Sequence, residues 1–348
     1  MTDAPRIAID AMGGDVGPEV MVAGAAQARA DFPDICFSFF GDEGAIGAEL
    51  AKHKALAGYS EIVHTEGVVS GEDKPSQAIR RSKDSSMGLA IGAVKAGEAQ
   101  AALSAGNTGA LMAMSKLALR TMPGIDRPAL AALLPSLGEN DVVMLDLGAN
   151  TECDAENLVQ FAVMGAAYAR TVLDIPRPRT ALLNIGSEEM KGTGLLKDAA
   201  ARLRAAEAIP LEFTGFIEGD RMSRGHVDVI VTDGFSGNIA LKTVEGTARF
   251  VADLIRQAFT SSLRSKAGFM LSRPAAILLK RTLDPNNHNG GVFLGLNGLV
   301  IKSHGSADSN GIRNAIGVAA KMAKADITRR ITEDLGNFPN QTSEDLAE

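Results

Sequence analysis

Short apolar runs, separated by glycine-rich turns and by helical patterns, organise this 348-residue chain. The runs 142–145 and 229–231 are continuously apolar, as strands buried on both faces of a sheet are. Because a segment of helical period follows most runs, strands and helices alternate as in βαβ units. The pattern predicts a three-layer α/β/α fold around a largely parallel sheet. Strands are expected at 6–12, 35–41, 61–64, 101–104, 129–134, 142–147, 179–185, 211–216, 227–232 and 299–302.

Residues that cap or break helices mark the expected helix boundaries. Pro18 stands where a helix would begin, since proline is favoured in the first helical turn. Direct joins between strands near 130–145 and 211–231 predict some antiparallel pairing. We expect residues 1–335 to form one α/β domain, two-lobed around a central cleft, and residues 336–348 to form a disordered tail. Further helices are expected at 107–120, 156–173, 193–207 and from 236 onward.

Five times, an apolar run is followed by a cluster of glycine with Ser, Thr, Asn or Asp and then by a helix. Unpaired backbone N–H groups and the positive dipole end of a helix N-terminus attract anions, and glycine lets a ligand approach. We expect the five turns to meet at one sheet edge and to form a cleft for phosphate or an oxyanion. For the side chains, plain helix capping is the alternative. The candidate binding residues are Gly13, Gly14, Asn107, Thr108, Ser187, Thr193, Ser236, Ser306 and Asp308.

Charge and missing motifs narrow the chemistry. A formal net charge of −7 and scarce aromatic residues argue against a nucleic-acid surface. No apolar run is long enough to span a bilayer, and the first strand starts at residue 6, so we expect a cytoplasmic protein. The chain has no GxSxG, P-loop, HExxH or GxGxxG motif, and its histidines are scattered. Neither a metal nor an organic cofactor is therefore implied.

A reaction that fits this inventory brings its own nucleophile. Inorganic phosphate attacking a thioester needs only positioning and anion stabilisation, which backbone donors and a few polar side chains supply. Lys191 is the cation best placed to meet phosphate, and a solvated loop lysine paired with Glu188 is the alternative. His304 follows an expected strand and stands where a general acid for a thiolate leaving group is needed; its alternative is a structural role.

The segment 249–283 differs from the rest of the chain. It contains seven lysines and arginines and a single acidic residue, Asp253, so it carries a net charge of +6. We expect a helical hairpin whose two helices are joined by an apolar tip that includes Phe269, Met270 and Leu271. An apolar tip flanked by cations is suited to an anionic membrane surface or to an acidic protein partner. Packing on its own domain or on a second copy is the alternative.

Seven stretches of the chain together form a specific pattern: IAIDAMGGDVGPE (7–19), SAGNTGALM (104–112), DLGAN (146–150), NIGSEEMKGTG (184–194), GFIEGD (215–220), VTDGFSGNIALK (231–242) and HGSADSNGI (304–312). In these stretches the chain resembles the bacterial phosphate acyltransferases of phospholipid synthesis, the acyl carrier protein:phosphate transacylases. The resemblance implies transfer of a long-chain fatty acyl group from acyl carrier protein to inorganic phosphate. The acyl phosphate would then serve a glycerol-3-phosphate acyltransferase.

The resemblance also implies a fold, an assembly and site residues. The fold is similar to that of phosphate acetyltransferase and, more remotely, to the isocitrate and isopropylmalate dehydrogenases, and the enzyme is implied to be a homodimer. The stretches 233–238 and 304–308 look similar to cleft segments of phosphate acetyltransferase. Peripheral membrane attachment through the hairpin is the family expectation. The catalytic residues implied in this way, together with Lys191, are Asp233, Asn238 and His304.

The residues leave two other functions open. A phosphate acyltransferase that acts on short-chain coenzyme A thioesters would share the chemistry. A membrane-associated scaffold of lipid synthesis would share the hairpin without catalysis. A second basic cluster, formed by Arg80, Arg81 and Lys83, offers the acidic carrier protein a docking place other than the hairpin.

Overall fold

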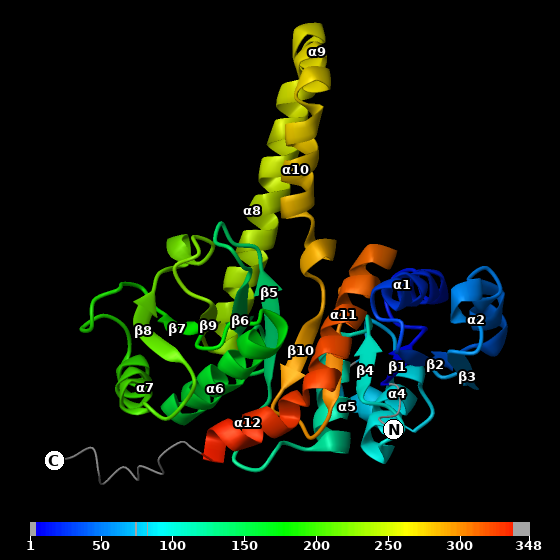
Figure 1. Cartoon of the computed structure of the whole chain (residues 1–348), viewed down its shortest axis with the longest axis horizontal. Helices are drawn as coiled ribbons and strands as arrows, with labels where there is room; N and C mark the ends of the chain where they lie inside the picture. Colours follow the sequence, from blue (N-terminus) through cyan, green and yellow to red (C-terminus); the bar gives the residue numbers. More distant parts are fainter. Residues whose placement is uncertain (1–4, 74, 82, 337–348) are drawn as a thin grey trace.

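The computed structural model describes residues 5–73, 75–81 and 83–336. One eleven-stranded sheet runs through this part of the chain, in the order β3-β2-β1-β4-β11-β10-β5-β6-β9-β7-β8. Helices cover both faces, so the expected three-layer α/β/α fold is confirmed (Figure 1). The strands are β1 (Arg6–Asp10), β2 (Cys36–Gly41), β3 (Ser60–His64), β4 (Ala101–Ser104), β5 (Ala129–Leu134), β6 (Val142–Leu145), β7 (Arg179–Leu183), β8 (Glu212–Ile217), β9 (Val229–Val231), β10 (Gly291–Leu294) and β11 (Leu299–Lys302).

On the first face of the sheet, one continuous hydrophobic core joins the strands to their helices. Ile7 and Ile9 of β1 belong to it, and so does Val143 of β6, five strands away. Ala8 points to the other face, because side chains alternate along a strand. This core thus holds together the two halves of the sheet, the first half from β3 to β11 and the second half from β6 to β8. Its helices are α1 (Pro18–Asp31), α2 (Glu43–Leu50), α6 (Ala155–Val172), α7 (Gly194–Ala205), α11 (Ser309–Ala325) and α12 (Ile327–Gly336).

On the second face, the core is divided into two clusters. One cluster joins β1, β4 and β11 to α3 (Pro75–Arg80), α4 (Ser86–Ala96) and α5 (Thr108–Leu119). The other joins β6 and β9 to the first turns of α8 (Gly234–Thr260). Leu130 of β5 packs partly against both clusters. The helix layer is therefore interrupted over the central strands β5 and β10, and a cavity lies there.

The sheet changes direction at its centre. β10 runs antiparallel to both β11 and β5, and β5 runs antiparallel to β6, whereas the other neighbouring strands are parallel. The carboxyl ends of β1, β4 and β11 therefore lie at one edge, and those of β6, β9 and β7 lie at the opposite edge. The expectation that all five glycine clusters meet at one edge is wrong, because the sheet reverses between β5 and β6, whereas β10 leaves β11 and β5 parallel to each other.

The predicted antiparallel joins have different outcomes. β5 and β6 pair antiparallel, which confirms the join near 130–145. The join near 211–231 is wrong, because β8 and β9 lie on either side of β7 and both run parallel to it. Among the described residues there are also three short 3-10 helices, η1 (Lys54–Leu56), η2 (Gly219–Arg221) and η3 (Pro285–His288). The expected tail at 336–348 lies outside the described residues, apart from Gly336 at the end of α12.

A helical hairpin projects from the body of the molecule (Figure 1). α8 leads outward, α9 (Leu263–Leu271) forms the tip and α10 (Arg273–Leu283) returns. The expected apolar tip with Phe269, Met270 and Leu271 is itself a short helix, which Ser262 caps by accepting the Ser265 N–H at 3.0 Å. Pro274 lies in the first turn of α10, where proline is favoured. In the described part of the chain, no helix combines the length and apolarity needed to span a membrane.

Candidate active site

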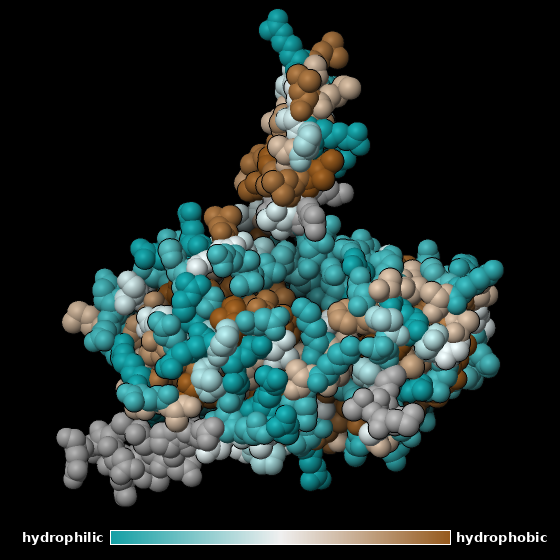
Figure 2. Space-filling view, in the orientation of Figure 1, coloured by the Kyte–Doolittle hydropathy of each residue, from teal (hydrophilic) through white to brown (hydrophobic). Residues whose placement is uncertain are grey.

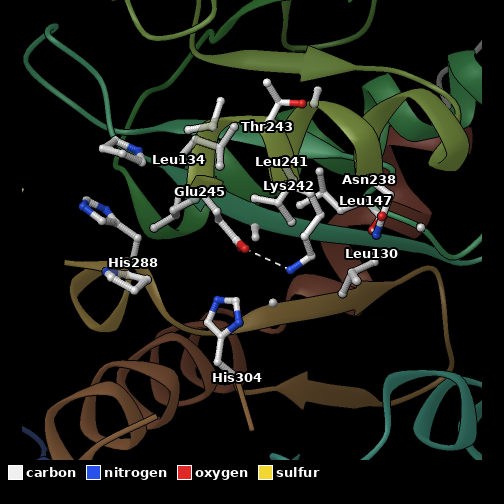
Figure 3. A pocket seen from close by; sticks show the side chains of 18 of the residues that line it. Leu130, Leu134, Leu147, Asn238, Leu241, Lys242, Thr243, Glu245, His288 and His304 are labelled. Carbon is white, nitrogen blue, oxygen red and sulfur yellow. Dashed lines mark hydrogen bonds and ion pairs between the residues drawn. The ribbon is translucent and has the colours of Figure 1, made fainter. Parts of the chain in front are cut away.

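A cavity of about 1110 Å³ occupies the gap in the second helix layer. Leu130, Ala132 and Leu134 of β5, with Phe293 of β10, form its floor, and residues of α5 and α8 form its walls. Figure 3 shows the α8 side chains on one side of the space and His304 on the other. An apolar cavity with a few convergent polar groups is typical of a ligand site.

Lys302, the last residue of β11, brings a largely buried ammonium group to this cavity. Its Nζ donates to the carbonyl oxygen of Ala105 at 3.3 Å and to the carbonyl oxygen of the next residue. Burial, and to a smaller extent the charge of Lys242, lower the pKa of Lys302 to about 8, although the charges of Asp10 and Asp15 oppose this shift. A lysine with so little water around it, yet largely protonated at pH 7, is suited to bind an anion.

His304 follows Lys302 closely and points into the same space (Figure 3). Buried Asn289 fixes its backbone: Oδ1 of Asn289 accepts the His304 N–H at 3.0 Å, and Nδ2 donates to Ser303 Oγ at 2.7 Å. Solvent reaches His304 through the cavity, but surrounding protein atoms lower the pKa of its ring below 6.5, against the opposing charge of Glu245. The imidazole is therefore mainly neutral at pH 7 and can accept a proton.

Four polar residues of α8 follow one side of the helix along the cavity: Asn238, Lys242, Glu245 and Arg249. The Nζ of Lys242 and the Oε2 of Glu245 form an ion pair of 2.9 Å, drawn as a dashed line in Figure 3. The Lys242 side chain is 59% exposed and the Glu245 side chain is 15% exposed, so solvent reaches the lysine and Lys242 can exchange this pair for a bound anion. The Nδ2 of Asn238 donates to the carbonyl oxygen of Leu147 at 3.1 Å.

The loop 146–150 holds the start of α8 in place. Asp146 is fully buried, and its carboxylate accepts three backbone N–H groups from β5 and from this loop. Two glycines of α8 allow the close contact: a Cβ on Gly237 would lie 1.9 Å from the Asp146 carbonyl oxygen, and one on Gly234 would lie 2.4 Å from the Asn150 carbonyl oxygen. These contacts fix the position of the first turns of α8, from which the polar residues along the cavity extend.

In the first half of the sheet, the loops after β1, β4 and β11 touch one another. The Asp15 N–H donates to the Gly305 carbonyl oxygen at 2.8 Å. A Cβ on Gly14 would lie 3.0 Å from that same oxygen, and one on Gly13 would lie 2.9 Å from a backbone nitrogen of the β4 loop. Both glycines therefore serve the packing of these loops. Among the predicted residues of the three loops, Thr108 and His304 line the cavity.

The remaining predicted residues cap helices or lie on the surface. Ser187, Lys191 and Ser306 are exposed and do not belong to the described lining of the cavity. The loop that carries Lys191 follows β7, which pairs with β9, so it lies at the same sheet edge as Asn238. Ser236 donates its backbone N–H to the cap of α8 at 2.8 Å. The helix-capping side chains are Asn107 of α5, Thr193 of α7, Asp233 of α8 and Asp308 of α11.

Lys302, Lys242 and Glu245 were not predicted as site residues. Lys302 is a lone cation at the carboxyl end of an apolar strand, a position where ligand sites of α/β folds are found. Lys242 and Glu245 follow Asn238 by four and seven residues and so share its side of the helix. Both features are visible in the sequence, but they become selective only when α8 and β11 are known to face one cavity.

Comparison with solved structures identifies the class of fold. A phosphotransacetylase from Streptococcus pyogenes superposes with a TM-score of 0.62 at 17% identity, covering 93% of this chain and 95% of that one. The EutD phosphotransacetylase from Staphylococcus aureus gives 0.59 at 15% identity, covering 92% and 94%. The chain therefore has the phosphotransacetylase fold, as the resemblance implied.

Comparison of sequences identifies the family. The family model described as "Fatty acid synthesis protein" matches residues 5–330, and the chain belongs to this family. A phosphate acyltransferase from Erythrobacter litoralis is 65% identical over 96% of this chain and 94% of its own length. One from Parvibaculum lavamentivorans is 55% identical, with 99% and 95% covered. The expectation of an acyltransferase enzyme in fatty acid and phospholipid synthesis is thus confirmed.

Proposed function

We propose that this chain transfers a long-chain fatty acyl group from acyl carrier protein to inorganic phosphate, giving an acyl phosphate for a glycerol-3-phosphate acyltransferase. The observation that carries the proposal is the cavity, in which Lys302, Lys242 and Arg249 bring positive charge to a largely apolar space. Phosphate requires the charge, and a fatty chain requires the apolar lining. The sheet runs through both halves around this cavity, so we treat residues 1–335 as one catalytic unit.

In the proposed reaction, an oxygen of the phosphate attacks the carbonyl carbon of the thioester. The tetrahedral oxyanion then collapses, the C–S bond breaks, and the proton of the attacking hydrogen phosphate ends on the thiolate of the carrier. Lys302 and Lys242 hold the phosphate. Neutral His304 accepts the proton and returns it to the leaving thiolate. Asn238 has a second amide N–H besides the one bound to Leu147, and we assign it to the oxyanion.

Lys191 and Asp233 complete the proposed machinery from the opposite sheet edge. Asp233 caps the start of α8, and Lys191 lies in the loop after β7, at the same sheet edge as Asn238, where we assign it to the incoming anion. Replacing Lys191 and Asn238 together by alanine should abolish turnover without lowering the melting temperature. Lys197→Ala, an exposed lysine of α7, is the matched control. Undiminished turnover in the double variant would remove both residues from the mechanism.

The choice of substrate separates this proposal from a short-chain enzyme and from a scaffold. We expect phosphate-dependent turnover of palmitoyl acyl carrier protein to exceed that of acetyl coenzyme A by at least about 100-fold in kcat/KM, because each buried methylene adds roughly 0.8 kcal/mol of binding free energy. A preference for acetyl coenzyme A would support the short-chain alternative. Absence of turnover with both substrates, for a protein that its host cells still require, would support the scaffold.

We propose that the hairpin attaches the enzyme peripherally to an anionic membrane. Leu271 is 87% exposed and Met270 is 78% exposed, and Figure 2 shows hydrophobic surface on the projecting hairpin, at its tip and along its stem. Basic residues flank these apolar side chains, which suits an anionic lipid surface. The carrier protein is then left to dock elsewhere, and Arg80 and exposed Arg81 offer it positive charge on the body.

We propose that the enzyme is a homodimer that covers an apolar patch in the second half of the sheet. Ile185 and Met190, in the loop after β7, are 82% and 80% exposed. Phe235 and Ile239 are also exposed, one helical turn apart at the start of α8, and the strands before these loops are neighbours. Large apolar side chains gathered in this way are typical of a protein interface. A second copy of the chain is the occupant that the family resemblance implies.

A further inference from the structure

The residues of the cavity floor next to Lys302 are small. Gly291 of β10 pairs with Lys302 of β11, and the register Val292 with Ala131 places Ala132 of β5 opposite Gly291. Residues directly opposite each other in a sheet point to the same face, and these three all line the cavity. The row therefore runs from an ammonium group across a glycine and an alanine.

Bulkier side chains border this row on the cavity face. Phe293 and Leu130, which pair with each other, rise on one side of Gly291 and Ala132. Leu134 follows Ala132 on the other side, two residues further along β5. The two small residues thus form the bottom of a groove, which we call the Gly291–Ala132 groove. It starts at Lys302 and leads toward the second half of the sheet.

The groove leads to an apolar lining. Beyond Ala132, the cavity is lined by Leu241 and Val244 of α8 and by Met222, all of which pack in or against the core of this half. Lys302 and His304, at and just after the carboxyl end of β11, lie on the other side of Gly291 and Ala132. A ligand that fits has an anionic or oxyanionic head and an unbranched apolar tail.

We propose that the Gly291–Ala132 groove holds the fatty acyl tail and that the size of the side chain at 132 limits the length of chain accepted. This inference rests on the proposed function and deepens it, since it names the path of the tail. The thioester carbon lies beside Lys302, and the methylenes pass over Gly291 and Ala132 toward Met222. No residue of this floor takes part in the chemistry, so its size changes selectivity without changing the reacting groups.

The test is Ala132→Phe, which adds a ring at a half-buried residue that lines the cavity and packs against the edge of the core. We expect kcat/KM for palmitoyl acyl carrier protein to fall at least about tenfold, because each excluded methylene forfeits roughly a fourfold gain in binding. kcat/KM for butyryl acyl carrier protein should change less than about twofold. Ala132→Ser, whose side chain is nearly as small, is the matched control. Gly291→Ala should lower the ratio of palmitoyl to butyryl kcat/KM less, since its Cβ would lie 3.2 Å from the movable end of Leu130 and in ordinary contact, at 3.6 Å, with the carbonyl oxygens of Ala131 and Lys302.

Binding of a fluorescent polyene fatty acid, measured without phosphate or carrier protein, is a second test that does not depend on turnover. Weaker binding to Ala132→Phe than to Ala132→Ser, at unchanged melting temperature, supports the groove. An equal fall in kcat/KM for the palmitoyl and the butyryl substrate, or unchanged binding of the fluorescent fatty acid, overturns the proposal. If the wild-type protein turns over neither thioester, the proposed function fails. Binding of the fluorescent fatty acid then decides alone whether the groove holds a fatty chain.

Discussion

Lys302 shows how one residue acquires a functional property from its place in the fold. An exposed lysine keeps a pKa near 10.4, whereas burial at the end of β11 lowers the pKa of Lys302 to about 8. The low pKa means that water solvates the ammonium group poorly. A bound phosphate would supply the missing favourable interaction, so the same burial that costs folding free energy favours binding of the anion.

Replacing Lys302 by methionine should therefore weaken phosphate binding. Methionine preserves the length of the side chain and removes its charge, and a hydrogen bond to a charged group contributes about 1.5–3 kcal/mol. We expect the KM for phosphate to rise by roughly 10- to 100-fold, while the KM for the acyl substrate changes little. Lys95→Met, at an exposed site on α4, serves as the control. An unchanged KM for phosphate would contradict the assignment.

The pKa of Lys302 also predicts a pH profile. As the pH rises through about 8, Lys302 loses its proton and its positive charge, so kcat/KM for phosphate should fall above this pH. In Lys302→Arg the guanidinium stays charged, and the decline should move to higher pH. Initial rates at low phosphate between pH 6.5 and 9.5 measure both profiles. The same decline in both proteins would assign it to another group.

At the scale of elements, α8 joins two functions in one helix. Its first turns pack on the loop 146–150 and face the cavity, and its later turns form the hairpin. Gly237 and Gly246 lie on this helix in contrasting surroundings. Gly237 is in close contact with Asp146, whereas a Cβ on Gly246 would meet no atom within 4 Å.

Gly237→Ala should consequently destabilise the protein by about 3 kcal/mol or more, since its Cβ would overlap with backbone that cannot easily move. Gly246→Ala should be neutral or stabilise by up to about 1 kcal/mol, because alanine favours the helix. Urea unfolding midpoints of the two variants provide the comparison. Equal midpoints would show that the contact between α8 and the loop does not constrain the fold.

The hairpin should be separable from catalysis. Phe269→Asp with Leu271→Asp removes apolar contact at the tip, so we expect sedimentation with anionic vesicles to be lost while turnover in solution is retained. Ala252→Glu with Gln257→Glu adds the same charge at exposed positions of the stem and controls for electrostatic repulsion. Lost turnover with unchanged vesicle binding would instead place the tip in the acyl or carrier-protein site.

At the scale of the whole molecule, the sequence predicted the parts better than their arrangement. Apolar runs located most strands, because burial on both faces leaves a direct mark in the residues. Strand β10 was missed: Gly291–Leu294 is four residues long and follows a turn. Gly13 and Lys191 were expected at one edge because the strand order, which puts the antiparallel pair of β5 and β6 between them, was not predicted. Strand order depends on contacts between distant segments, which a single sequence does not display.

The candidate site was predictable only in part, because the sequence displays local motifs but not the contacts between distant segments. Asn238 and His304 were found because each belongs to a glycine cluster that follows an expected strand, and both line the cavity. Asp233 and Asp308 share such motifs and cap helices. Lys302 was missed because only tertiary structure buries it. Local motifs thus reveal helix starts, but the cavity is formed by the interruption of one helix layer.

The assembly is also open to measurement. Ile185→Glu with Met190→Glu introduces charges into the exposed apolar patch, so we expect analytical ultracentrifugation to show a shift from dimer to monomer at micromolar concentration. Leu117→Glu, at an exposed leucine of α5, should leave the association unchanged. A dimer that persists in the double variant would place the interface on another surface.

The most direct test of the central claim is release of free thiol from palmitoyl acyl carrier protein by the purified enzyme, with and without millimolar phosphate. The acyl product is followed by its reaction with hydroxylamine. We predict that thiol release requires phosphate and is matched by equal formation of acyl hydroxamate. Thiol release that is independent of phosphate, or no release from a carrier substrate shown to be intact, would contradict phosphate acyl transfer in this cavity.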